Sequence, residues 1–117
     1  MIMDDLINEI QAKSKQLSLN ISSLKKTGRE YANAYSKYRI ELAKELLRLR
    51  DSGMPVTMAY DVARGNPEIA KLKQDEISKE TIYKANQESI NAIKLQIKIL
   101  DNQIQREWGE NDWRDLA

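Results

Sequence analysis

The sequence contains no cysteine and no histidine, and these two absences exclude much of the common chemistry of proteins. Without cysteine there is neither a disulfide nor a thiolate nucleophile, and cysteine usage does not indicate whether the protein resides in an oxidising or a reducing compartment. Without either residue, a zinc site of imidazole and thiolate ligands cannot form, and neither can a Ser-His or Cys-His nucleophile pair. We therefore expect no cofactor and no catalytic centre of these types.

Glycine and proline are scarce, with four and two residues, and phenylalanine is absent. The glycines are too scattered for a Walker-type phosphate loop or a dinucleotide-binding fingerprint. No apolar run approaches the length that crosses a bilayer, and residues 1–5 lack the basic and apolar regions of a signal peptide. The sequence thus predicts a cytoplasmic protein that is not an enzyme and has no membrane partner.

An excess of charge of one sign is also missing, because 19 basic and 18 acidic side chains leave a net charge of +1. Such a chain has no overall field to attract nucleic acid, anionic lipid or an acidic substrate. Its 117 residues suit a single domain, and the dominance of Ile, Leu, Lys, Glu, Gln, Asn and Ser favours helices held together by aliphatic contacts.

What the chain does contain is a seven-residue repeat of apolar side chains, which predicts two long helices of coiled-coil type. In the first long helix, expected over about residues 4–52, one column of the repeat is Ile7, Ser14, Ile21, Gly28, Tyr35, Leu42 and Leu49. The other column begins just before that range and is Met3, Ile10, Leu17, Leu24, Tyr31, Tyr38 and Glu45. Over residues 67–108 they are Ile69, Glu76, Tyr83, Ile90, Ile97 and Ile104, and Leu72, Lys79, Asn86, Ile93, Leu100 and Glu107.

Two places in the repeat leave alternatives open. The first helix is expected to continue through Gly28, where a kink is the alternative. Residues 93–100 alternate between apolar and polar side chains, as in a strand. No turn residue flanks that run and the repeat passes through it in phase, so a helix is expected.

The two long helices are expected to reverse at residues 53–66. Gly53 suits the position just past a helix end, and Pro55 prevents the helix from resuming at once. Thr57 is expected to cap a short helix that runs to about Arg64 and ends at Gly65. The predicted fold is therefore all-α: a long antiparallel helical hairpin with a short helical turn.

The second long helix is expected to start with Asn66 as its cap and Pro67 as its first residue. Pairing the helices outward from the middle of the turn places Gly28 opposite Ile90. Gly109 is expected to end this helix, which leaves a loose tail at residues 109–117.

Three exposed surfaces are candidates for interaction. A hairpin of two helices buries one stripe of each, so a leftover apolar band is expected to drive self-association into a dimer or a larger bundle. That band comprises Ile40, Leu47, Leu95 and Ile99. The turn offers an apolar tip, which either docks a partner or caps the end of the bundle. The tip comprises Met54, Val56, Met58, Tyr60 and Arg64.

The third surface is the basic cluster Lys25, Lys26 and Arg29, which could contact phosphates or simply form the exterior of a coiled coil. Two further groups have an ordinary explanation beside a functional one. Tyr31, Tyr35 and Tyr38 could stack bases, but tyrosines at this spacing more often pack in a core. Carboxylates at Asp75, Glu76 and Glu80 could hold Mg²⁺, but a solvated face paired with lysines is favoured.

Several short motifs resemble one family of proteins. They are Gly53-Met54-Pro55-Val56, Asp61-Val62-Ala63-Arg64-Gly65, Leu72-Lys73, Tyr83-Lys84-Ala85, Glu88-Ser89-Ile90-Asn91, Lys94-Leu95 and Arg106-Glu107-Trp108-Gly109. Across roughly residues 46–109 the chain resembles small helical proteins encoded in the early, replication and recombination region of temperate phages and prophages of Gram-positive bacteria. The resemblance implies a host-cell cytoplasmic setting but carries over no activity and no catalytic residues.

The expected function is that of a homo-oligomeric interaction protein that binds a host or phage protein, for example as an inhibitor of a host nuclease or defence protein. The alternative is an accessory nucleic-acid-binding protein of phage replication or recombination.

Overall fold

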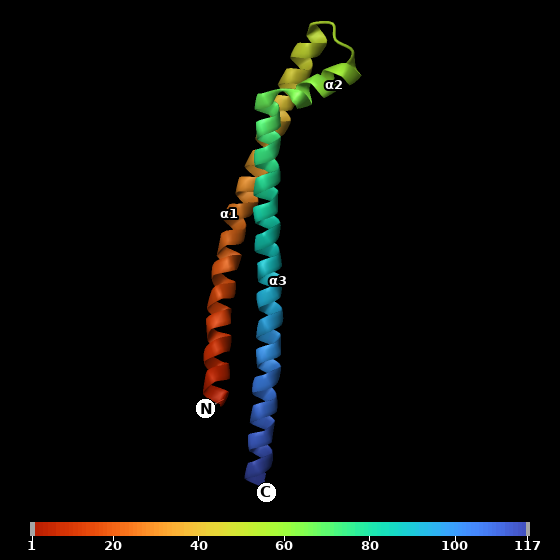
Figure 1. Ribbon diagram of the computed structural model, residues 1–117. Coiled ribbons are helices and arrows are strands. Elements are labelled where there is room, and N and C mark those ends of the chain that lie inside the picture. The colour runs from red at the N-terminus through yellow and green to blue at the C-terminus, as the bar shows by residue number, and fades with distance from the viewer. Residues whose placement is uncertain (1, 117) are drawn as a thin grey trace. The chain divides into compact units, whose positions relative to one another are not determined.

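A computed structural model describes residues 2–116, with side chains described as far as Gly109. It contains three helices: α1 (Ile2–Asp51), α2 (Val56–Gly65) and α3 (Pro67–Leu116). The residues between them are 52–55 and Asn66. The all-α helical hairpin with a short helical turn is thus confirmed (Figure 1).

Helix α1 continues without interruption through Gly28, and α3 is helical throughout 93–100, as predicted. The serine-rich part of α1 stays helical although serine is a weak helix former. Ser22 and Ser23 each donate a hydrogen bond to the backbone carbonyl four residues earlier, so their hydroxyls are satisfied within the helix.

The chain forms two compact units. The turn unit, Lys25–Lys84, contains the second half of α1, all of α2 and the start of α3. The end unit combines Met1–Leu24 with Ala85–Ala117, so it pairs the beginning of α1 with most of α3. Each unit is held by contacts between residues far apart in the sequence.

Helix α1 ends in a Schellman motif, which starts the reversal. Gly53 has φ +92°, a left-handed conformation that glycine adopts without steric cost. The Gly53 amide donates to the Arg50 carbonyl, and the Met54 amide donates to the Leu49 carbonyl. These are the two hydrogen bonds of that motif, so Gly53 plays the role predicted for it.

The starts of the next two helices differ in how they are capped. Thr57 lies inside α2; Pro55 occupies the cap position, without a side-chain hydrogen bond, so the predicted Thr57 cap is wrong. Pro55 fits there because its fixed φ suits a helix entry. Asn66 does cap α3: its side-chain oxygen accepts a hydrogen bond of 2.9 Å from the Glu68 amide.

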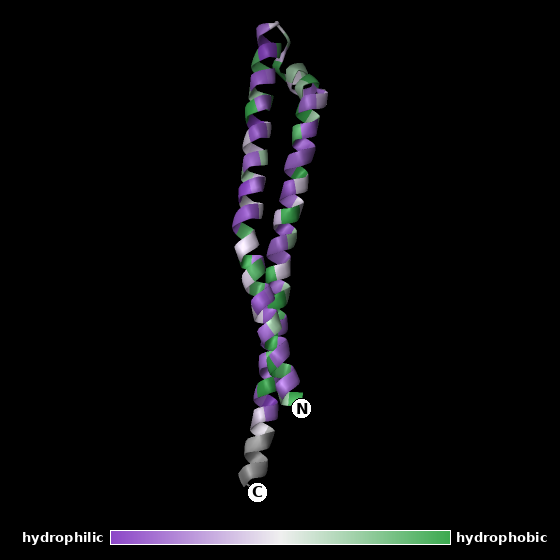
Figure 2. Ribbon diagram, turned by 90° about the vertical axis from the view of Figure 1, so that its left-hand side faces the viewer, coloured by the Kyte–Doolittle hydropathy of each residue, from purple (hydrophilic) through white to green (hydrophobic). Residues whose placement is uncertain are grey.

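The core of the turn unit is built where α2 packs against the long helices. Buried members of this cluster are Tyr38, Leu42, Leu49, Ala59, Ala63 and Ile69, with Leu46, Met54 and Leu72 packed around them. Ala59 and Ala63 have no exposed surface, and their small side chains let α2 approach closely. Hydrophobic and polar residues mix along both long helices, as Figure 2 shows, so burial is confined to narrow stripes.

The predicted columns of α3 all lie at the helix contact, at least partly buried. In α1 one column, from Met3 to Glu45, is likewise correct. The other is correct only at Leu42, Leu49 and the half-buried Gly28, because Ile7, Ser14, Ile21 and Tyr35 are exposed. Their places are taken by Leu6, Lys13, Asn20 and Ala34, and Thr27 is half-buried beside Gly28.

This one-residue offset has a geometric cause. A helix with 3.6 residues per turn drifts by roughly 20° per heptad from a strict seven-residue column. The contact stripe absorbs the drift with two successive steps of four residues, from Ala34 to Tyr38 and from Tyr38 to Leu42. After that step the stripe joins the predicted column.

The predicted pairing register is wrong by one heptad. Gly28 lies against Tyr83 instead of Ile90: a Cβ added to Gly28 would be 3.2 Å from Cε1 of Tyr83. The reason is that α2 already belongs to the returning half, since its alanines pack in the same cluster as Leu42 and Leu49. The reversal is therefore centred near Pro55 and not in the middle of residues 53–66.

The predicted helix end at Gly109 is also wrong, because α3 continues through it to Leu116. Glycine in a helix interior costs only about 1 kcal/mol relative to alanine, and no proline follows to stop the helix. The side chains of 110–117 lie outside the described residues.

Candidate interaction surfaces

The apolar tip predicted at the turn divides into two parts in the structure. Met54 packs against the core of the turn unit and contributes to its stability. Val56, Met58 and Tyr60, together with Val62, which the sequence interpretation did not single out, have exposed fractions of 58%, 57%, 39% and 45%. These four side chains of α2 form what we call the α2 surface.

The α2 surface follows from the helical positions of its residues. Ala59 and Ala63 are one turn apart and face the core, while Met58 and Val62 flank them on one side and Val56 and Tyr60 on the other. The guanidinium carbon of Arg64 lies 5.2 Å from the centroid of the Tyr60 ring, a cation–π contact. Arg64 is therefore placed beside the apolar side chains, as the sequence analysis grouped it.

The four residues predicted for self-association are all exposed. In the turn unit, Ile40 and Leu47 of α1 have exposed fractions of 54% and 60%. In the end unit, Leu95 and Ile99 of α3 have exposed fractions of 59% and 51%. Each pair lies on the face of its helix that points away from the hairpin contact, so each unit has an apolar stripe of its own.

The basic cluster is exposed as well, and it belongs to a larger pattern. Residues 25–51 carry eight basic and four acidic side chains, an excess far above the net charge of the whole chain. All eight basic side chains are exposed, whereas Glu30, Glu41 and Glu45 are half-buried at the inner side of the helix. Lys25, Lys26 and Arg29 thus begin a basic outer face of α1, which whole-chain charge counting concealed.

The tyrosines lie mainly in the core. Tyr38 is buried, and the Tyr31 ring lies with its centroid 6.0 Å from that of Tyr83. Burial raises the pKa of the Tyr31 hydroxyl, and the Glu80 carboxylate raises this pKa further. Tyr35 is 47% exposed, so it does not join the other two in a stacking platform.

Two of the three carboxylates considered for Mg²⁺, Glu76 and Glu80, are engaged with lysines, and Asp75 is exposed. Glu76 is buried, and its oxygen accepts a hydrogen bond of 2.9 Å from Lys73 Nζ. The hydrogen bond to Glu76 raises the pKa of Lys73. Glu80 pairs with Lys84 at 2.6 Å, and this hydrogen bond lowers the pKa of Glu80. Within the described part of the chain no group of three metal-ligating side chains forms.

A polar layer crosses the helix contact in the end unit. The Asn20 side chain donates a hydrogen bond of 3.0 Å to the Ser89 hydroxyl, and the Asn86 side chain donates one of 3.1 Å to the backbone carbonyl of Asn20. Asn86 lies in a predicted contact column, whereas Asn20 does not, because the predicted column of α1 runs through Ile21, one residue later.

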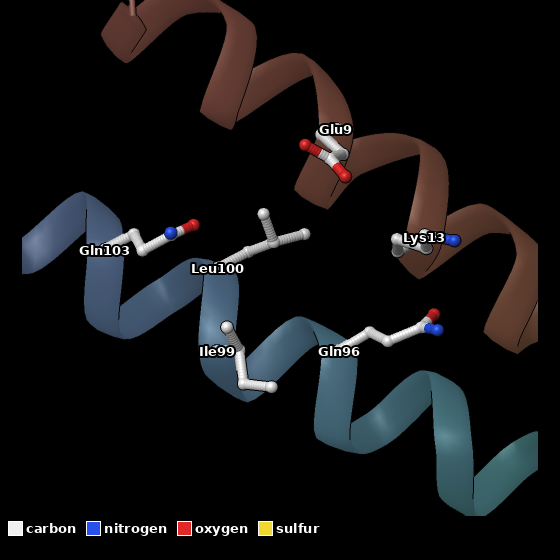
Figure 3. A pocket seen from close by; sticks show the side chains of 6 residues that line it. All are labelled: Glu9, Lys13, Gln96, Ile99, Leu100 and Gln103. Carbon is white, nitrogen blue, oxygen red and sulfur yellow. The ribbon is translucent and has the colours of Figure 1, made fainter.

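Three indentations of the end unit are open grooves and not enclosed cavities. One of about 310 Å³ lies between α1 and α3 and is lined by Glu9, Lys13, Gln96, Ile99, Leu100 and Gln103 (Figure 3). Glu9 is the single acid among these lining residues, so the groove has no pair of acids. Over the described residues, no helix has the length and apolar character needed to cross a membrane.

Comparison with known proteins gives no match to a family model, a curated protein or a solved structure.

Proposed function

We propose that this chain is a non-enzymatic interaction protein, a homo-oligomeric helical scaffold that docks another protein on the α2 surface. One observation carries the proposal. Helix α2 is attached through two alanines, while four larger apolar side chains remain 39–58% exposed.

The sequence left two explanations for an apolar tip, capping of the bundle end or docking of a partner. A helix that only closes a bundle is expected to turn its largest apolar side chains inward, because each buried Å² of apolar surface contributes roughly 25 cal/mol. Helix α2 does the reverse with Met58 and Val56. Capping is supplied by Met54, Ala59 and Ala63, so the exposed side chains favour docking.

The setting of the proposal comes from the resemblance to small proteins of temperate phages and prophages. In that setting the partner is a host or phage protein in the host cytoplasm, and an inhibitor of a host nuclease or defence protein fits a small scaffold with an exposed apolar tip. Exposed apolar patches mark protein interaction sites in other soluble proteins.

The test compares partner capture by three forms of the tagged chain in bacterial lysate, followed by quantitative mass spectrometry. Met58→Asp/Tyr60→Asp places two charges on the α2 surface, and Ser36→Asp/Ser78→Asp places two charges on exposed polar positions of the long helices in the same unit. We expect the wild type and the control to retain the same partner and the α2 variant to lose it. Helicity by circular dichroism should be equal in all three.

Two results would overturn the proposal. One is a partner retained equally by all three forms, which would place docking elsewhere. The other is an α2 variant that unfolds early but still captures its partner when folded, since that would make the α2 surface structural.

A second candidate, an accessory nucleic-acid-binding protein, is favoured by the basic outer face of α1. Its test is fluorescence anisotropy of labelled duplex DNA at several salt concentrations, because each phosphate contact adds about 0.9 to the slope of log K against log salt. Lys25→Gln/Lys26→Gln/Arg29→Gln should reduce that slope, whereas Lys94→Gln/Lys98→Gln should leave it unchanged. Affinity independent of salt, or absent, would exclude this candidate.

A further inference from the structure

The exposed apolar stripe of α3 in the end unit, formed by Leu95 and Ile99, is flanked by charges in a self-complementary pattern. Counting 100° per residue, Leu95 and Ile99 lie roughly 160° around the helix from the buried residues Ile90, Ile93 and Leu100 and the partly buried Ile97. Figure 3 agrees, with Leu100 directed towards α1 and Ile99 directed away from it. The stripe is therefore not used by the hairpin.

The charged residues at the two ends of this stripe have opposite signs. Glu88 lies before Leu95, and Arg106 lies after Ile99; both are exposed. They are 18 residues apart, which is five turns of 3.6 residues, so they project from the same side of the helix. Among the described residues neither has an ion-pair partner.

The residues next to the stripe are amides, and the charged Lys98 lies beyond Asn91, about 80° around the helix from the centre of the stripe. Asn91 and Asn102 border it on one side, Gln96 and Gln103 on the other. Ala92 adds a small exposed side chain between Glu88 and Leu95. A second helix can therefore lie along the stripe without bringing a charged flank against an apolar side chain.

We propose that this face of α3 pairs with the same face of a second copy of the chain, with the two helices antiparallel. If the two-fold axis passes midway between Leu95 and Ile99, Leu95 of each copy meets Ile99 of the other. The same axis places Glu88 of each copy beside Arg106 of the other, which gives two ion pairs. Ala92 then faces Asn102, a small residue opposite a polar one.

The opposite orientation fails on charge. A parallel pair places Glu88 beside Glu88 and Arg106 beside Arg106, and like charges at such distances repel. The stripe of α1 in the turn unit also does not suit self-pairing. Ile40 and Leu47 are bordered by basic residues on both sides, so two copies would bring lysines and arginines together in either orientation. The bordering residues are Lys37, Arg39, Lys44 and Arg50.

This proposal rests on the homo-oligomeric part of the function proposed above, and it is independent of docking by α2. Its test is the dissociation constant of self-association, measured by sedimentation at several concentrations. Glu88→Arg and Arg106→Glu each replace two attractive contacts by two repulsive ones. Each should weaken association on the order of tenfold, since exposed pairs are individually weak.

An equimolar mixture of these two variants should restore association, because both contacts in the mixed pair are again attractive. Leu95→Asp should weaken association at least as much, and Lys94→Glu, a charge change outside the stripe, should leave it unchanged. A wild-type chain that stays monomeric at high concentration overturns the proposal. So does a dissociation constant that the two single variants leave unaltered.

The lack of natural cysteine permits a second measurement that reports orientation. A mixture of Ala92→Cys and Asn102→Cys chains should form disulfide-linked dimers on mild oxidation, and neither variant alone should do so. Cross-linking of Ala92→Cys with itself would show a parallel pair and would refute the inference. A monomeric variant that still captures a partner through α2 would separate failure of this inference from failure of docking.

Discussion

The contact between Gly28 and Tyr83 provides a quantitative test of the register of the turn unit. In an ordinary helix interior, replacing glycine by alanine stabilises the fold by roughly 0.5–1 kcal/mol. Here the added methyl group would lie 3.2 Å from Cε1 of Tyr83 and 3.7 Å from Cδ1 and Cζ. Carbon atoms in good contact are about 3.5–4.0 Å apart, so the ring must shift by a few tenths of an ångström.

The cost of that shift is set by what the ring touches. Tyr83 is half-buried, so the ring has room to move, and the cost should be below the 1–3 kcal/mol that is typical of overpacking in a closed core. The shift also disturbs the pair of Tyr83 with Tyr31, and such aromatic pairs contribute about 0.5–1.5 kcal/mol. We expect the gain and the cost to cancel, so that Gly28→Ala changes stability by less than about 0.5 kcal/mol.

A double-mutant cycle isolates the contact from the glycine effect. In a Tyr83→Ala background the ring is absent, and Gly28→Ala should then stabilise by the full amount of about 1 kcal/mol. The measurement is urea denaturation followed by circular dichroism at one fixed protein concentration, because self-association would make stability depend on concentration. Equal effects of Gly28→Ala in both backgrounds would show that Tyr83 does not lie on Gly28 and would refute the observed register.

Three other predictions concern single features. Gly53→Ala should lower the free energy of unfolding by about 1–2 kcal/mol in the same assay, because φ is +92° there. An unchanged free energy of unfolding would show that the Schellman motif is absent. Ala63→Leu should lower the free energy of unfolding by about 1–3 kcal/mol, because the larger side chain at this fully buried position pushes α2 away from the core. An unchanged free energy of unfolding would mean that α2 does not pack there. Hydrogen bonding to Lys84 lowers the pKa of Glu80, so this pair stabilises the fold above pH 4.5 and the stabilisation is lost as pH falls through the lowered pKa. The melting temperature should therefore fall on acidification, and it should fall less in Lys84→Met. Identical profiles of melting temperature against pH for the wild type and this variant would contradict the prediction.

The three helices, and the ends marked by Gly53 and Asn66, were predictable from local signals, whereas the predicted Thr57 cap and the predicted end at Gly109 were wrong. Gly53 and Asn66 act within a few residues of themselves, and their geometry depends little on the rest of the chain. The contact positions of α3 were predictable because its apolar residues keep a strict seven-residue spacing. In α1 the contact includes Lys13 and Asn20, and no apolar pattern points to such residues.

The register and the surfaces depended on information that periodicity lacks. A heptad repeat looks the same after a shift of seven residues, so the apolar pattern cannot tell which heptad of α3 meets Gly28, whereas the folding of α2 against Leu42 and Leu49 can. The exposed band residues Ile40, Leu47, Leu95 and Ile99 were correctly predicted to be outside the hairpin contact, because they lie opposite the repeat. The division of the tip into a partly buried Met54, packed on the core, and an exposed Met58 could not be predicted, since both residues are equally apolar.

The polar layer of Asn20, Asn86 and Ser89 has a consequence for how the chain tolerates changes in length. Apolar contacts survive a slip of one heptad because one aliphatic side chain replaces another, but the hydrogen bonds of this layer connect specific partners. The hydrogen bonds of the end unit thus fix the register of α1 against α3 there, without a contribution from the turn. We therefore expect that one or two residues inserted within 52–55 leave the hydrogen bond between Asn20 and Ser89 in place.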